Sequence, residues 1–237
     1  EHAGGTVPMI VVPASIDNDV NGTELTLGFD SAVARAVDYV DDLRETARAL
    51  SRIFVVEVMG RDQGHIAVEV ALATGAEEVL VPELPFSDDL AAALVRRLRA
   101  SRVNGRGSAI VIVAEGLQID REPLQSAAEP VSRFLAAELR DLPWEVRTHI
   151  VGHVQRGAQQ TARTRNLAAR CGVFSVDRLH DLVANRQSVG HPEMCCISRS
   201  GALTLGVVSG DMIASDDGGL AERLELCRRL SYFGGTD

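Results

Sequence analysis

Two aspartates separated by one residue follow a short apolar run near the start of the chain, in the loop Ser15-Ile16-Asp17-Asn18-Asp19. Side chains two positions apart on an extended backbone point the same way, so both carboxylates could face one ligand. Such a pair suits a magnesium ion or a catalytic base beside a phosphate. The same residue types are also typical of ordinary turns, and the spacing alone favours the turn.

Polar residues also follow two strongly apolar runs further along the chain. Met59-Gly60-Arg61 ends one run and Glu115 ends another. Glycine lets a ligand approach the backbone, and arginine can bind a phosphate through two parallel hydrogen bonds. A carboxylate such as Glu115 can accept hydrogen bonds from sugar hydroxyls. Each of these residues, considered alone, is equally well explained as part of a strand-end turn or of the surface.

A third group of polar residues is cationic. His153 and Arg156 lie in Gly-His-Val-Gln-Arg-Gly, and Arg147 precedes His153 by six residues. All 24 residues of the Lys and Arg class are arginine, so any anion must be held by arginine, histidine or backbone N–H groups. A lone histidine is usually a core residue, but the flanking glycines and nearby arginines favour a phosphate pocket at one strand end.

The elements that must position these residues alternate between apolar strands and amphipathic helices. This alternation predicts an α/β fold with a mainly parallel sheet, in which ligands gather at the C-terminal ends of the strands. The candidate residues named above follow such ends. The predicted strands are 9–13, 53–58, 79–82, 109–114, 145–151 and 203–208, and the predicted helices are 31–50, 65–74, 87–102, 130–139, 163–170, 176–184 and 219–230.

Composition narrows the class of protein. Hydrophobic residues make up 46% and charged residues 24%, as in ordinary globular proteins, and the net charge of -9 argues against a nucleic-acid partner. No apolar run approaches the roughly 20 residues needed to span a bilayer, and no N-terminal signal pattern is present. The four cysteines lack paired spacing and indicate reduced thiols. We therefore expect a cytoplasmic protein without a membrane or nucleic-acid partner.

Four segments together resemble the phosphofructokinase family, in particular the ATP-dependent 6-phosphofructokinases of the A type. Each segment would be weak alone, but their order and spacing match across most of the chain. The segments are Pro13 to Asp30, Val55 to Arg61, Ala114 to Gly116 and Gly152 to Gly157.

The resemblance implies phosphoryl transfer from ATP, as co-substrate, to the 1-hydroxyl of fructose 6-phosphate, giving fructose 1,6-bisphosphate in glycolysis. By this resemblance Asp17 is the catalytic base and Asp19 helps to hold Mg²⁺. Ser15 keeps a hydroxyl for the transferred phosphoryl group, where the family has threonine. One alternative is a non-catalytic sugar-phosphate-binding or regulatory relative, and another is a pyrophosphate-dependent enzyme. Ala14 disfavours the pyrophosphate-dependent enzyme, because family members that use pyrophosphate commonly carry lysine at this position.

The resemblance also implies roles for residues on the sugar side. Arg52 would reach the sugar site of a neighbouring subunit, which implies a homo-oligomer, either a tetramer or a dimer. Arg44, Glu77 and Arg106 fall where bacterial relatives bind an allosteric effector. The substrate residues would be Met59 and Gly60 along the sugar, Arg61 at the transition-state charge, Glu115 at the sugar hydroxyls, and Arg147, His153 and Arg156 at the 6-phosphate.

The architecture implied by the resemblance has two domains, each a three-layer α/β/α sandwich, with the N-terminal nucleotide-binding part of the first domain missing. The expected division is a remnant of the nucleotide-binding domain with the catalytic loop at 1–29 and a sugar-phosphate-binding domain at 30–154. A return segment to the first domain follows at 155–215, and a C-terminal helix at 216–237.

Overall fold

The computed structural model describes residues 7–119, 126–185, 191–208 and 220–231. The chain divides into two compact units. Unit 1 comprises residues 1–31 and 159–218, and unit 2 comprises residues 32–158 and 219–237. The sequence predicted boundaries at 29, 154 and 215 and gave a role in nucleotide or sugar-phosphate binding to the stretches between them. That division and those roles remain predictions.

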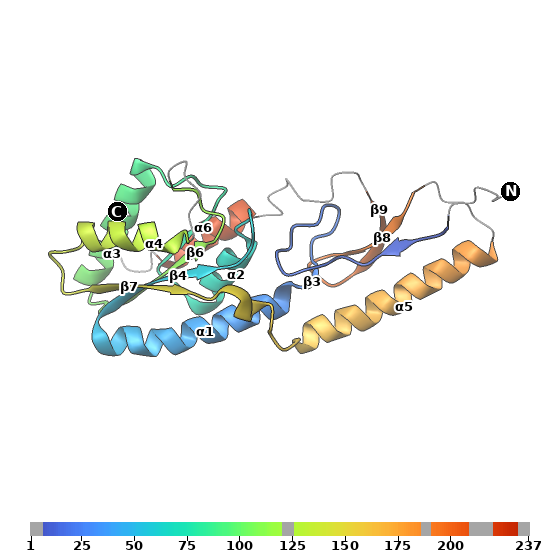
Figure 1. Ribbon diagram of the computed structural model, residues 1–237, viewed down its shortest axis with the longest axis horizontal. Helices are drawn as coiled ribbons and strands as arrows, with labels where there is room; N and C mark the ends of the chain where they lie inside the picture. Colours follow the sequence, from blue (N-terminus) through green and yellow to red (C-terminus); the bar gives the residue numbers. More distant parts are fainter. Residues whose placement is uncertain (1–6, 120–125, 186–190, 209–219, 232–237) are drawn as a thin grey trace. The chain divides into compact units, whose positions relative to one another are not determined.

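Unit 2 is built on a four-stranded parallel sheet with the strand order β5-β6-β4-β7 (Figure 1). All residues of β6, and all residues of β4 after Arg52, are buried. Continuous apolar runs of this kind are typical of parallel strands that are covered on both faces. The strands are β4 (Arg52–Val58), β5 (Glu78–Leu80), β6 (Ala109–Ala114) and β7 (Glu145–Ile150).

Helices cover both faces of this sheet. On one face, strand residues such as Val55 and Val111 share a hydrophobic cluster with Leu94 of α3 and Leu135 of α4. On the other face, α2 contacts β5 and β6, and Tyr39 of α1 donates to or accepts from His149 of β7 at 3.1 Å. The predicted three-layer arrangement is thus confirmed for unit 2. The helices are α1 (Phe29–Leu50), α2 (His65–Thr74), α3 (Asp88–Val103), α4 (Ala128–Glu138) and α6 (Leu220–Ser231), the last packed on α2 and β5.

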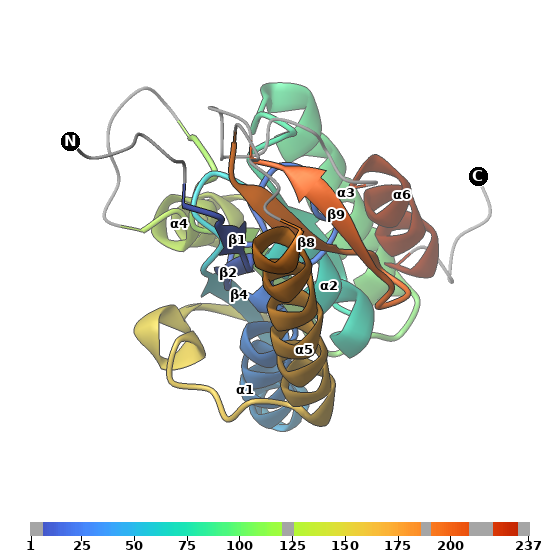
Figure 2. The ribbon, with the colours of Figure 1, turned by 90° about the vertical axis from the view of Figure 1, so that its right-hand side faces the viewer.

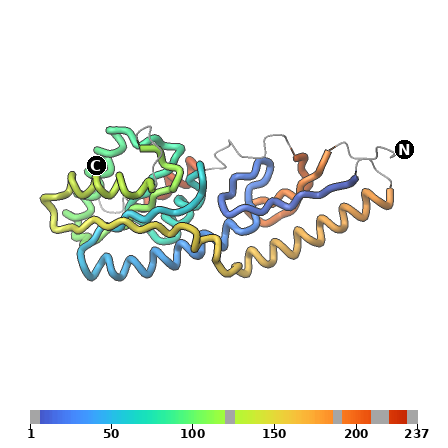
Figure 3. Tube along the Cα trace, in the orientation of Figure 1, coloured from blue at the N-terminus to red at the C-terminus, as the bar shows by residue number. Residues whose placement is uncertain are grey.

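Unit 1 is built on a smaller, mixed sheet with the order β1-β8-β9. β1 pairs with β8 in parallel, and β8 pairs with β9 antiparallel. Figure 3 shows this pairing as blue and orange segments side by side, although they are far apart in the sequence. Helix α5 packs on β1, β3 and β8 (Figure 2). The elements are β1 (Ile10–Val11), β2 (Ala14–Ser15), β3 (Leu27–Gly28), α5 (Ala162–Ala184), β8 (Glu193–Ile197) and β9 (Leu203–Val207), with β2 and β3 forming a parallel pair.

Helix α5 corrects one prediction. Two helices were expected, at 163–170 and 176–184, but one helix runs through the whole stretch. Thr161 begins it by accepting a hydrogen bond from the N–H of Thr164 at 3.1 Å. Gly172 weakens a helix by about 1 kcal/mol, but the buried stripe that includes Leu167, Cys171 and Leu182 continues past it. Packing on the sheet therefore outweighs the glycine.

Strand β8 was not predicted. Its five residues are all buried between two neighbouring strands. A short apolar run after Pro192 was the available signal, but its two cysteines were interpreted only as thiols. The other predicted elements are present with ends shifted by at most a few residues, although the first predicted strand, 9–13, is shortened to β1. The two-residue strands β2 and β3 were not predicted either. No helix in the described part of the chain is long and apolar enough to cross a membrane.

Candidate active site

The acidic loop of unit 1 is held by hydrogen bonds from side chains to the backbone. Ser15 Oγ accepts from the N–H of Asp17 at 3.1 Å and donates to Asp19 Oδ1 at 3.0 Å. Asn18 closes the other side, since its Oδ1 accepts from the N–H of Thr26 at 2.9 Å. Asp17 and Asp19 are 4% and 5% exposed. One serine hydroxyl therefore connects the two aspartates.

The reason expected for the carboxylate pair was wrong. The prediction assumed an extended backbone, but residues 16 and 17 lie in a bend and Asn18 has a φ of 59°. Asparagine tolerates this left-handed conformation better than most residues. The Ser15 hydroxyl accepts from the N–H two residues on, so the loop begins with a serine-type turn that carries two buried acids, and this hydroxyl rather than strand geometry relates them.

In unit 2, the turn Met59-Gly60-Arg61 follows β4 directly. Gly60 and Arg61 have φ values of 148° and 52°, so both lie in the left-handed region. Glu115, at the end of the neighbouring strand β6, accepts through one oxygen, Oε1, from the N–H of Gly60 at 3.0 Å and of Arg61 at 2.7 Å. Glu115 Oε1 thus fixes the backbone that carries Arg61.

Gly116 allows a second close approach to the same turn. A Cβ at this position would lie 2.2 Å from the carbonyl oxygen of Arg61 and 3.0 Å from Cα of Asp62. Only glycine fits there without displacing the backbone of the turn. Glu115 therefore binds the N–H of Arg61, and Gly116 leaves room for its carbonyl.

The turn after β7 brings two cationic side chains to the surface of unit 2. His153 and Arg156 lie in and just after the 3₁₀ helix η1 (Gly152–Gln155), and both are exposed. Neither side chain makes a hydrogen bond or ion pair with another described residue. Gln155 points the opposite way, is 1% exposed, and accepts from the N–H of Met59 at 2.8 Å. The structure therefore connects η1 directly to the turn that carries Arg61.

Arg147 does not share this strand end. It lies in the middle of β7 and binds Glu145, to which Arg52 also donates from Nε at 2.6 Å. Hydrogen bonds from Arg52 and Arg147 hold the pKa of the Glu145 carboxyl below its ordinary value. Arg147 thus lies nearer the start of β7 than expected, whereas His153 and Arg156 follow its end, and the joint role of the three at a phosphate remains a prediction.

The three expected effector residues lie together in unit 2. Arg106 and Arg44 approach Glu77 Oε1 at 2.8 and 3.6 Å, and Glu77 Oε2 accepts from the N–H of Ile110 at 2.7 Å. Arg44 also donates to the carbonyl of Thr74 at 2.8 Å. These contacts satisfy a buried carboxylate at the start of β6. Their role in binding an effector remains a prediction.

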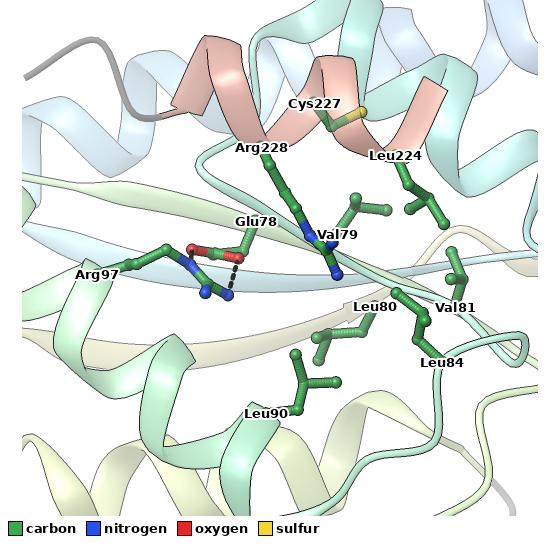
Figure 4. A pocket seen from close by; sticks show the side chains of 10 residues that line it. All are labelled: Glu78, Val79, Leu80, Val81, Leu84, Leu90, Arg97, Leu224, Cys227 and Arg228. Atoms are coloured by element: carbon green, nitrogen blue, oxygen red, sulfur yellow. Dashed lines mark hydrogen bonds and ion pairs between the residues drawn. The ribbon is translucent and has the colours of Figure 1, made fainter. Parts of the chain in front are cut away.

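A small cavity lies elsewhere in unit 2, between β5, α3 and α6 (Figure 4). Its volume of about 20 Å³ is enough for a water molecule but not for a sugar phosphate. Glu78 in its wall is bound by Arg97 through two hydrogen bonds, and Arg228 points into the same space. None of the predicted site residues lines this cavity.

The acidic loop could bind a metal ion only if phosphate oxygens and waters supplied the rest of its ligands. In the described ranges, no group of three or more histidine, cysteine, aspartate or glutamate side chains could hold a metal ion. Mg²⁺ is, however, commonly bound by one or two carboxylates while phosphate oxygens and waters complete its octahedron. The adjacent acids Asp17 and Asp19 match that donor set.

Residues 1–179 match the family model described as Phosphofructokinase. The chain belongs to the phosphofructokinase family. This match spans the acidic loop, the turn at Arg61, Glu115 and the segment from His153 to Arg156. The predicted family is thereby confirmed.

Individual relatives agree with this assignment. The chain is 44% identical over 173 residues to the ATP-dependent 6-phosphofructokinase 1 of Thermus thermophilus, and 40% identical over 172 residues to the ATP-dependent 6-phosphofructokinase of Brevibacillus brevis. Each match covers 73% of this chain and 50% of the relative, so the chain spans about half the length of the curated relatives it matches. The solved phosphofructokinase of Saccharomyces cerevisiae is 29% identical with a TM-score of 0.71, covering 91% of this chain and 26% of that one.

Two residues that position the candidate site had no role in the prediction. Asn18 lies between the two aspartates, and its tolerance of a positive φ was a usable signal. Gln155 lies in the segment Gly152 to Gly157, which resembles the family, but only its neighbours His153 and Arg156 were assigned roles. Nothing in a single sequence indicates that Gln155 points inward while these two point outward.

Proposed function

We propose that this chain carries the sugar-phosphate site and the catalytic base of an ATP-dependent 6-phosphofructokinase. The enzyme transfers the γ-phosphoryl group of ATP to the 1-hydroxyl of fructose 6-phosphate, giving fructose 1,6-bisphosphate and ADP in glycolysis. The observation that carries the proposal is that one family match, over residues 1–179, contains every proposed catalytic and substrate-binding residue. The names of the relatives support ATP as the donor, and Ala14 agrees with that choice.

The proton of the attacking hydroxyl goes to Asp17. As the 1-oxygen forms its bond to the γ-phosphorus, the bond from that phosphorus to the bridging oxygen breaks, and ADP leaves. A general base of this kind contributes about 10²- to 10⁴-fold to the rate. Ser15 supports the base through the hydrogen bond from the N–H of Asp17, and its hydroxyl, which donates to Asp19 in this structure, would turn to the transferred group.

Asp19 would hold Mg²⁺ together with the phosphates of ATP. The metal supplies neutralisation of the charge that develops on the phosphoryl oxygens. Arg61 adds a fixed positive charge to the same group, since its backbone is held by Glu115.

The sugar phosphate is held by the strand-end groups of unit 2. His153 and Arg156 have no carboxylate partner among the described residues, which leaves the imidazole and the guanidinium to bind a phosphate dianion. Glu115 accepts the two backbone hydrogen bonds through Oε1 alone, so its Oε2 can accept a hydrogen bond from a sugar hydroxyl. Met59 and Gly60 border the sugar.

Arg147 joins His153 and Arg156 at the 6-phosphate, and Arg52 acts in an oligomer, tetramer or dimer, in which it reaches the sugar phosphate of a neighbouring subunit. Glu145, the shared partner of Arg52 and Arg147, leaves this trio with a net charge of +1, because two guanidiniums face one carboxylate. Arg44, Glu77 and Arg106 form the effector site, and the enzyme acts in the cytoplasm.

The substitution Asp17→Ser tests the activity. Turnover of fructose 6-phosphate with ATP and Mg²⁺, followed as ADP release, should fall by about 10²- to 10⁴-fold because the base is lost. The dissociation constant for fructose 6-phosphate, measured by calorimetry, should stay within about threefold, because the phosphate-binding residues are unchanged. Pyrophosphate in place of ATP should not support turnover.

Three results would contradict the proposal. Full activity of the Asp17→Ser chain would remove the assigned base. Turnover with pyrophosphate but not ATP would favour the pyrophosphate-dependent alternative. A parent chain that binds fructose 6-phosphate but transfers no phosphoryl group from either donor would favour a non-catalytic sugar-phosphate-binding relative.

A further inference from the structure

Three consecutive backbone N–H groups at the end of β4 are each bound by a side-chain oxygen. Gly60 and Arg61 donate to Glu115, as described above, and Met59 donates to Gln155 Oε1 at 2.8 Å. The two acceptors come from different elements, because Glu115 follows β6 and Gln155 ends η1. The turn that carries Arg61 is therefore held from two sides.

The burial of Gln155 is unusual for a residue of its type. Its side chain is 1% exposed, and its Nε2 makes no hydrogen bond with any described residue. A buried donor without a partner is destabilising, by about 1–3 kcal/mol in proteins. The glutamine nevertheless supplies Oε1 to the N–H of Met59, an acceptor that an apolar side chain of similar size would lack.

The contact makes η1 and the turn at Arg61 one mechanical unit. Within a single turn of η1, His153 and Arg156 face outward while Gln155 faces β4. A shift of η1 would therefore displace the N–H of Met59, and with it the backbone of Gly60 and Arg61. Catalytic geometry must be kept within fractions of an ångström, so such a connection has a direct effect on binding and rate.

We propose that Gln155 is a positioning residue that sets the distance between the phosphate-binding groups His153 and Arg156 and the turn carrying Arg61. The proposal rests on the proposed function, because fructose 6-phosphate is the ligand that must meet both groups at once. Gln155 acts through the backbone of Met59 and does not itself need to touch the substrate.

The test compares Gln155→Met and Gln155→Glu in the full chain with the exposed control Gln160→Met. Methionine keeps the size but removes the acceptor, whereas glutamate keeps an oxygen for the N–H of Met59. Amide hydrogen exchange measured by NMR reports each N–H separately, and calorimetry gives the affinity for fructose 6-phosphate.

In Gln155→Met we expect exchange at the amide of Met59 to accelerate at least about tenfold. The amides of Gly60 and Arg61, held by Glu115, should stay protected. The dissociation constant for fructose 6-phosphate should rise about tenfold, because two halves of one site lose their fixed spacing. Gln155→Glu should keep the amide of Met59 protected, and Gln160→Met should match the parent in both measurements.

Unchanged exchange at Met59, or an affinity within twofold of the parent in Gln155→Met, would overturn the proposal. An unfolded Gln155→Met chain would also overturn it, because Gln155 would then serve general stability. If the parent fails to bind fructose 6-phosphate, the proposed function fails. The exchange pattern at Met59 would still support or overturn the positioning contact separately.

Discussion

The two units hold their candidate residues in different ways. In unit 2, Arg61 and Glu115 stand at the ends of strands buried on both faces, and side-chain oxygens bind the backbone of the turn. In unit 1, Asp17 lies between two-residue strands, in a loop closed by the hydroxyl of Ser15 and the amide of Asn18. Burial of a sheet positions the first group, and local polar contacts position the second.

The difference extends to the way each unit is packed. Helices cover both faces of the unit 2 sheet, with α3 and α4 on one face and α2 on the other. In unit 1, Val173 and Val176 on α5 and Val207 on β9 are 64%, 64% and 58% exposed. Substitutions of apolar residues should therefore have large effects in unit 2 and small effects on the exposed faces of unit 1.

The largest contrast is expected between Leu135→Ala and Val176→Ala. Leu135 is fully buried in the unit 2 cluster, so its truncation leaves a cavity and should lower the free energy of unfolding by about 2–5 kcal/mol. Val176→Ala should change it by less than about 0.5 kcal/mol. Denaturant titration followed by circular dichroism measures both, and fluorescence of Trp144, the single tryptophan, reports unit 2 alone. Equal losses would remove the contrast.

Glycines should show a contrast of intermediate size. Gly116→Ala forces a Cβ against the carbonyl of Arg61, so we expect a loss of about 1–3 kcal/mol in unfolding free energy, with weaker binding of fructose 6-phosphate. The matched control is Gly172→Ala in α5, where a Cβ meets nothing within 4 Å. That change should stabilise the helix by about 0.4–1 kcal/mol. A stabilising Gly116→Ala would contradict the assigned close approach.

The smallest contrast concerns pH and two arginine–glutamate pairs. In unit 1, the hydrogen bonds from Arg178 lower the pKa of Glu193 despite partial burial. In unit 2, burial raises the pKa of Glu78, and the opposing hydrogen bond from Arg97 does not overcome it. A lowered folded-state pKa gives stability that is lost as pH falls through it, whereas a raised one gives stability that is lost as pH rises through it.

Thermal unfolding of the Glu193→Gln and Glu78→Gln chains between pH 3 and pH 7 measures this difference. The parent should exceed Glu193→Gln in stability at pH 7, and the advantage should shrink as pH falls below the ordinary glutamate pKa of about 4.3. The advantage of the parent over Glu78→Gln should instead grow as pH falls. The same pH trend for both pairs would show that burial does not dominate at Glu78.

Much of unit 2 could be predicted because its local patterns agree with its tertiary structure. The run of apolar residues in β6 is typical of a parallel strand covered on both faces, and the predicted bounds of β6 and α2 are those observed. Ser87 begins α3 as expected, accepting from the N–H of Leu90 at 3.3 Å. Strand β8 was missed because five residues of mixed type gain their burial only from the strands beside them.

The amino-acid sequence by itself indicated the family, through four segments that resemble it in order and spacing. It also indicated the parallel sheet of unit 2, through the alternation of apolar strands and amphipathic helices. The tertiary structure alone decided which partner each polar group takes. Arg52 binds Glu145 because the pairing of β4 with β7 brings them together, and Gln155 faces Met59 because η1 turns it inward. In the acidic loop, the bend held by Ser15 and Asn18 places the two buried carboxylates. The direction of a hydrogen bond depends on backbone conformation, and residue spacing in the sequence does not give that conformation.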